Sequence, residues 1–213
     1  MILEGMHVAV LATDGVEQSE LTEPIKALRE TGAEVEIVSI KEGQIQGVHH
    51  ATAADKFDVD YHITDVRADD YDAVVIPGGP RNADQMRRSQ EVQDFLRAAD
   101  ADGKPLAVIC HGPWELTASD LVSGRRLTSY PKIQDDIRSA GGHWEDKPVV
   151  VDGNWVSSRR PSDLPAFNQA MLRVFADYLD KAGMADPYDK SRHMGGSHPG
   201  IEVETQTDSQ GPG

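Results

Sequence analysis

The sequence is short of cysteine, of basic residues and of long apolar runs, and each shortage excludes a class of protein. The 213 residues include one cysteine, Cys110, so neither an intramolecular disulfide nor a multi-cysteine zinc site can form. Lys and Arg number 21 against 36 Asp and Glu, which gives a formal net charge of −15. Such an acidic surface repels phosphates, so we expect no nucleic-acid partner.

Long apolar runs and cofactor motifs are missing too. No run approaches the roughly 20 apolar residues of a membrane span, and the start, MILEGMHVAVLATDG, lacks the basic and apolar regions of a signal peptide. We therefore expect a cytoplasmic protein that does not bind membranes. The sequence has no GxGxxG, Walker, HExxH or GxSxG pattern, so we expect no cofactor and no metal site.

What is present is an alternation of short apolar runs with amphipathic stretches. The runs predict strands over 7–13, 33–40, 72–76, 105–109, 148–151 and 154–158, and residues 41–54 are expected to form a hairpin or an irregular excursion. The amphipathic stretches predict helices over 20–31, 89–101, 115–122, 133–140 and 164–181. This order predicts an α/β fold whose mostly parallel sheet is covered by helices on both faces.

The composition changes near Gly183. Residues 183–213 are rich in Gly, Pro, Ser and Asp and have few apolar residues to bury. We expect one domain over residues 1–182, followed by a tail that lies on the surface or across a partner subunit. His193 and His198 in this tail are expected to be solvated.

Three predicted strands end in chemically unusual residues, namely Asp14–Glu17, Pro77–Gly79 and Cys110–His111. Because sites in parallel sheets form beyond the carboxyl ends of the strands, we expect these segments to share one site. Cys110 lies between a buried strand and a helix that Pro113 can begin. Such a strand–nucleophile–helix turn exposes a nucleophile, and the helix N-terminus is expected to lower the pKa of the thiol.

The neighbours of the cysteine suggest partners for it. His111 can accept the thiol proton, and Glu17, Asp84 and Glu115 are the acids that could orient this histidine. Glu17 could instead hydrogen-bond the sulfur and tune its oxidation, or only favour the start of a helix. The backbone N–H groups of Gly78 and Gly79 could stabilise an oxyanion, or these glycines could only form a turn.

Several of these segments together resemble one family. They are PGG at 77–79, GKPLAVICHGPWEL at 103–116, GRRLTSYP at 124–131 and VVVDGNWVSSRRPSDLPAF at 149–167. They look like the PfpI branch of the ThiJ/PfpI superfamily, which includes intracellular cysteine peptidases and stress proteins described as protein deglycases. The resemblance spans about 7–178. It implies a flavodoxin-like three-layer sandwich of the class I glutamine amidotransferase-like type, assembled as a homodimer or a larger homo-oligomer.

The resemblance also implies roles for individual residues. Cys110 corresponds to the nucleophile and His111 to its neighbouring histidine, while Glu17 corresponds to the acid that contacts the sulfur. Asp84 corresponds to the third triad residue, which a neighbouring subunit donates, although the archetypal peptidases have a glutamate there. Gly79 and the backbone of His111 correspond to the oxyanion contacts.

These features predict a cysteine-dependent hydrolase in the stress response. Its expected substrates are proteins glycated by methylglyoxal or glyoxal, with peptides as the second choice. The alternative is a redox-sensing stress protein with little turnover, whose Cys110 is oxidised to sulfenic or sulfinic acid.

Overall fold

The six predicted apolar runs form six strands of a central seven-stranded sheet in the computed structural model, which describes residues 2–183. The seventh strand, Tyr61–His62, was not predicted. Neighbouring strands are parallel except for the antiparallel pair β11–β12 at one edge. In sheet order the strands are β11 (Val149–Asp152), β12 (Trp155–Ser158), β8 (Leu106–Ile109), β7 (Ala73–Ile76), β1 (His7–Leu11), β3 (Glu34–Ser39) and β6 (Tyr61–His62).

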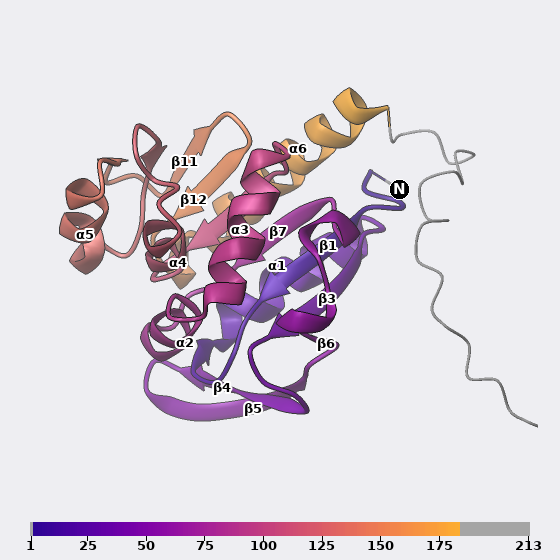
Figure 1. The fold of residues 1–213 in the computed structure, drawn as a ribbon, viewed down its shortest axis with the longest axis horizontal. Helices are drawn as coiled ribbons and strands as arrows, with labels where there is room; N and C mark the ends of the chain where they lie inside the picture. The colour runs from indigo at the N-terminus through magenta and orange to yellow at the C-terminus, as the bar shows by residue number, and fades with distance from the viewer. Residues whose placement is uncertain (1, 184–213) are drawn as a thin grey trace, which may run out of the picture.

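Helices cover both faces of this sheet. Along β1, Val8 and Val10 belong to the core that also contains the buried residues of α1 (Gln18–Glu30) and α6 (Leu164–Ala182). The alternate residues, Ala9 and Leu11, belong to the core under α3 (Gln90–Ala101), which lies in front of the sheet in Figure 1. This alternation follows from the two-residue period of a strand. The predicted flavodoxin-like sandwich is confirmed.

Of the two alternatives for residues 41–54 the hairpin is the one present, although its second strand extends to Asp58, and it has a role in placing the site. It consists of β4 (Gln44–His49) and β5 (Thr52–Asp58), at the bottom of Figure 1. Strand β4 also pairs with β2 (Val16–Glu17). This pairing holds the hairpin turn at His50 and Ala51 beside the segment that follows β1.

Several elements differ from the sequence prediction. The helix expected over 115–122 is α4 (Pro113–Ala118), because Pro113 begins it and the backbone leaves the helical region at Asp120, whose φ is 59°. Short strands β9 (Arg126–Leu127) and β10 (His143–Trp144) were not predicted, and α5 (Gln134–Ser139) lies between them in the sequence. Helix α2 (Pro80–Met86) follows the two glycines directly, although the sequence suggested only a turn there.

Residues 2–183 have neither a helix that could span a membrane nor a cluster of side chains suited to a metal ion. None of the helices in this range has the length and apolarity needed to cross a bilayer. The same range holds no cluster of three or more His, Cys, Asp or Glu side chains suited to a metal ion. The predictions for the tail, including those for His193 and His198, lie outside the described residues.

Candidate active site

The ends of three adjacent strands, β1, β7 and β8, meet at one cavity of about 590 Å³. The cavity is lined in part by Glu17 and Glu20 from the segment after β1, by Gly79 after β7, and by Cys110 and His111 after β8. Because parallel strands run the same way, their carboxyl ends share one edge of the sheet. The predicted convergence of these strand ends is confirmed.

Cys110 sits on a strained backbone turn between β8 and α4. Its φ is 62°, in the left-handed region that costs a residue with a side chain roughly 1–2 kcal/mol. Its N–H donates to the carbonyl of Ser158 at 3.1 Å, and its carbonyl accepts from the N–H of Tyr130 at 2.8 Å. Gly112 permits the turn, since a Cβ there would lie 2.7 Å from the carbonyl oxygen of Ile76. The turn is therefore held from both sides, and it presents the sulfur to the cavity.

His111 is close enough to exchange a proton with the thiol. Its Nδ1 lies 3.2 Å from the sulfur of Cys110. The ring stacks on Tyr130 with centroids 4.7 Å apart and meets the edge of Trp114 at 5.2 Å. Burial, aided by the charge of Lys132, lowers the pKa of His111 to about 4. The imidazole is thus neutral at neutral pH and can accept a proton.

Glu20 is the acid beside the sulfur, a role that the sequence analysis gave to Glu17. The Glu20 side chain is fully buried and hydrogen-bonded to the Cys110 thiol, and its Oε2 accepts the N–H of Gly78 at 2.9 Å. The Glu17 carboxylate also lines the cavity, but Oε2 accepts the N–H of His50 at 2.8 Å. The assignment of Glu17 as the sulfur contact is wrong, because α1 turns Glu20 inward and β2 turns Glu17 toward the hairpin.

The thiol and the Glu20 carboxyl titrate as a pair. Burial raises the pKa of Glu20 to about 8, so this carboxyl is protonated at neutral pH. Burial also raises the pKa of the Cys110 thiol, and an ionised Glu20 would raise it further. The N–H groups of Gly79 and His111 bond to the sulfur and act in the opposite direction. Burial thus overrides the lowering predicted from the helix N-terminus.

These contacts determine how readily a thiolate forms. When the thiol loses its proton, the two N–H donors stabilise the charge on the sulfur, and a Glu20 that is still protonated can donate a third hydrogen bond to it. A carboxyl that keeps its proton therefore supports a thiolate, whereas an ionised carboxylate would oppose one.

The two glycines after β7 have different tasks. Gly79, with φ of 92°, directs its N–H at the sulfur, where it can also reach an oxyanion. The N–H of Gly78 is occupied by Glu20 and does not serve an oxyanion. A Cβ on Gly78 would lie 2.6 Å from that of Cys110, so only glycine fits there. The predicted oxyanion role of Gly78 is therefore wrong.

The other two candidate acids lie away from the imidazole. Both carboxylate oxygens of Glu115 are buried without a hydrogen-bond partner, so the suggestion that it orients His111 is wrong. Asp84 on α2 is bonded to Arg87 at 2.6 Å and to Arg88 at 2.8 Å. Those guanidinium groups lower its pKa. Among the residues described, no carboxylate hydrogen-bonds to His111.

Comparisons with known proteins identify relatives of this chain. A sequence model described as the DJ-1/PfpI family matches residues 6–174. A deglycase of Pyrococcus abyssi is 42% identical over 169 residues, covering 79% of this chain and 99% of that protein. General stress protein 18 of Bacillus subtilis is 40% identical over 171 residues, covering 80% of this chain and 98% of that protein.

A solved structure extends the likeness to three dimensions. It is a two-domain protein from Anabaena variabilis with a DJ-1/ThiJ/PfpI-like domain and a ferritin-like domain. The TM-score is 0.73 at 34% sequence identity, over 84% of this chain and 48% of that one. The resemblance read from the motifs is thus confirmed over most of the described residues.

Proposed function

The chain belongs to the DJ-1/PfpI family, and we propose that it is a cysteine-dependent hydrolase of the deglycase type that works as a homodimer. One observation carries the proposal. The Cys110 sulfur, on its strained turn, lies 3.2 Å from a neutral imidazole and also contacts a buried carboxyl and two N–H groups. A buried structural thiol needs none of these partners.

In the proposed reaction the adduct first rearranges to the isomeric lactoyl amide or thioester by a proton shift through an enediol, and Cys110 then attacks the carbonyl carbon of that isomer. His111 takes the thiol proton at Nδ1 while the carbon–sulfur bond forms, and the N–H groups of Gly79 and His111 hold the oxyanion. The carbon–nitrogen or carbon–sulfur bond of the substrate then breaks, and the leaving amine or thiol takes the proton back from His111. Water hydrolyses the acyl-enzyme, which releases a carboxylic acid and restores the thiol.

The proposed substrates are methylglyoxal adducts of amines and thiols. An aminocarbinol adduct and the corresponding lactoyl amide are isomers, so converting one into the other moves hydrogen within the molecule and needs no external oxidant. Hydrolysis of the lactoyl amide gives lactate and the free amine. A cavity of about 590 Å³ holds such a group together with part of the residue that bears it.

The proposed homodimer supplies the acid that His111 lacks. Within this chain Asp84 is bound to two arginines and is about one-third exposed, and it does not line the cavity. We propose that Asp84 of a second copy reaches the free edge of the His111 ring and fixes its tautomer. Arg87, which binds Asp84, also reaches the surroundings of the site. Its guanidinium lies 4.5 Å from the centre of the Trp114 ring, and that ring contacts His111.

The test is turnover of a methylglyoxal adduct of a neutral thiol, followed by lactate release. We expect Cys110→Ser to abolish turnover and Asp84→Asn to reduce it by about 100-fold. Mixing the Cys110→Ser and Asp84→Asn variants should raise activity well above that of either variant alone, because one of the two sites in a mixed dimer is intact. No turnover by the unmodified protein would refute the hydrolase. Full activity of Asp84→Asn would refute the triad.

Redox sensing is the second candidate, and the contact between Glu20 and the sulfur favours it. A thiolate that attacks hydrogen peroxide becomes a sulfenate and releases water, and a second peroxide gives a sulfinate. The Glu20 carboxyl and the N–H groups of Gly79 and His111 are hydrogen-bond donors for the new oxygen atoms. Intact mass after peroxide treatment tests this role, and we expect Asp84→Asn to oxidise at the normal rate.

A further inference from the structure

The cavity around Cys110 has an uneven distribution of charge. Glu17 and Glu20 come from the segment after β1, on one side of the strand that bears the cysteine. Lys132 and Arg160 also line the cavity, and Arg160 follows β12, the strand on the other side of β8. Lys132 is two residues from Tyr130, whose ring stacks on His111. The two cations thus border the His111 side of the cavity.

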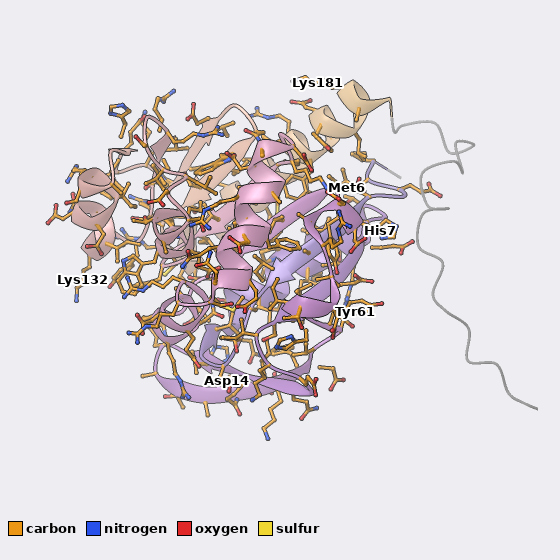
Figure 2. The ribbon with its side chains drawn as sticks, viewed as in Figure 1. Met6, His7, Asp14, Tyr61, Lys132 and Lys181 are labelled. Carbon is orange, nitrogen blue, oxygen red and sulfur yellow. The ribbon has the colours of Figure 1, made fainter. Side chains whose placement is uncertain are left out.

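Neither of these cations is used elsewhere in the described part of the chain. Lys132 and Arg160 are exposed, and neither side chain forms an ion pair or hydrogen bond within residues 2–183. The neighbouring Arg159 differs, since it binds Asp146 at 2.7 Å and Asp163 at 2.9 Å. Figure 2 shows Lys132 at the outer edge of the molecule. In a chain with 36 acidic residues and 21 basic ones, two uncommitted cations at the mouth of the reactive cavity need an explanation.

We propose that Lys132 and Arg160 form a carboxylate-binding subsite, which directs the enzyme to adducts on free amino acids and on C-terminal residues of peptides. This proposal rests on the proposed function. An adduct on an internal residue has no free α-carboxylate a few bonds from the reacting carbon, whereas these substrates do. The cations would hold that carboxylate at the rim while Cys110 attacks the carbonyl carbon of the adduct.

The surrounding charges favour a carboxylate over a phosphate. A net charge of −15 repels every anion that approaches, and Glu17 lies in the same cavity. Lys132 and Arg160 bring two positive charges and the Glu17 carboxylate brings one negative charge, so a bound monoanion leaves this part of the cavity neutral, whereas a dianion leaves it negatively charged. Exposed cations contribute modestly one by one, so the pair is the unit that matters.

Two alkylating agents of nearly equal size test the subsite without turnover. Iodoacetate carries a carboxylate and iodoacetamide does not, and the single cysteine makes intact mass an unambiguous readout. The ratio of their rates cancels any change in the amount of thiolate. We expect this ratio to exceed that of a free model thiol at the same ionic strength. We expect it to fall about fivefold in the Lys132→Gln/Arg160→Gln variant.

The matched control removes two other exposed cations. Arg173 and Lys181 lie on α6, and Figure 2 shows Lys181 at the top of the molecule, well separated from Lys132 at the left edge. The Arg173→Gln/Lys181→Gln variant changes the net charge equally, so it should keep the ratio of the unmodified protein. Equal ratios in all three proteins would overturn the subsite. An equal fall in both variants would overturn it too, because the effect would then come from net charge.

Turnover then tests the substrate class. The methylglyoxal hemithioacetals of N-acetylcysteine and of its amide differ only in the carboxylate. We expect kcat/KM to favour the acid form, and this preference to disappear in the Lys132→Gln/Arg160→Gln variant. Without turnover of either adduct the proposed function fails, while the alkylation ratio still reports the subsite. Stronger protection of Cys110 by inorganic phosphate than by acetate would overturn the choice of a carboxylate.

Discussion

The first turns of α1 and α4 each bury a glutamate completely, and the two glutamates differ in what surrounds them. Glu20 in α1 contacts the Cys110 thiol and accepts the N–H of Gly78. Glu115 in α4 has no partner for either carboxylate oxygen. Burial raises the pKa of both carboxyls, to about 8 for Glu20 and well above its ordinary value for Glu115. The third residue of the helix therefore contacts the reactive thiol in α1, whereas in α4 its burial only lowers the stability of the fold.

This difference shows that a raised pKa does not by itself identify a functional acid. Desolvation acts on any buried carboxyl, whatever its neighbours. What distinguishes Glu20 is a reactive atom within hydrogen-bond reach and a backbone donor that fixes the orientation of the carboxyl. Glu115 has neither, so no neighbouring group is placed to accept its proton.

The largest expected effect separates the two glutamates by activity. Glu20→Leu removes the proton donor beside the sulfur and should lower kcat/KM for the methylglyoxal adduct by about 100-fold. The kcat/KM of Glu115→Leu should stay within about twofold of that of the unmodified protein, because Glu115 contacts no reacting atom. Equal losses in the two variants would show that burial near Cys110, rather than contact with it, is what matters.

The pH profile sharpens the same comparison. Turnover should fall as pH drops through about 4, where His111 becomes protonated and can no longer accept the thiol proton. It should also fall as pH rises through about 8, where Glu20 ionises and opposes the thiolate. The limiting slope is about tenfold per pH unit on each side. Glu20→Gln cannot ionise, so its upper limb should be missing, and an unchanged upper limb would assign that limb to another group.

Stability should respond to Glu115 in a pH-dependent way. Its folded-state pKa lies above the unfolded value near 4.5, so the unfolded chain loses this proton first and stability declines as pH rises above about 4.5. Glu115→Leu removes this cost together with two unpartnered oxygens, and should stabilise the protein at pH 7.5 by about 1–3 kcal/mol. Urea unfolding at pH 4.5 and 7.5 measures the gain, which should be smaller at the lower pH. A less stable variant at pH 7.5 would mean that Glu115 has a partner in solution.

The sequence was sufficient for six of the seven strands of the sheet and for the reactive pair, because both depend on local patterns. Apolar runs marked the strands, and the order of strands and helices required their ends to meet at one edge. Cys110 and His111 are adjacent, so their contact needed no knowledge of packing. The predicted hairpin could be placed in the chain, but its position beside Glu17 depends on pairing with β2, which no local signal reveals.

Choosing between Glu17 and Glu20 required the orientation of α1. The contact depends on which residue the helix turns inward, and α1 begins at Gln18, two residues before the predicted start. One signal was present in the sequence. Glu20 shares its helical face with Pro24 and Leu28, both buried, so an acid lay within an apolar stripe. Helix α2 was missed because the two glycines suggested only a turn, although the Pro80 that follows them is a residue common in the first turn of a helix.

The alkylation rate of Cys110 by iodoacetamide against pH tests the central claim, that Glu20 controls the thiol and Glu17 does not. The proteins to compare are the unmodified chain, Glu20→Leu and Glu17→Leu, with intact mass as the readout. We predict that Glu20→Leu raises the apparent pKa of Cys110 by about one unit or more, since the thiolate loses a hydrogen-bond donor in a buried site. Glu17→Leu should leave the apparent pKa nearly unchanged. A shift in Glu17→Leu with none in Glu20→Leu would contradict the account.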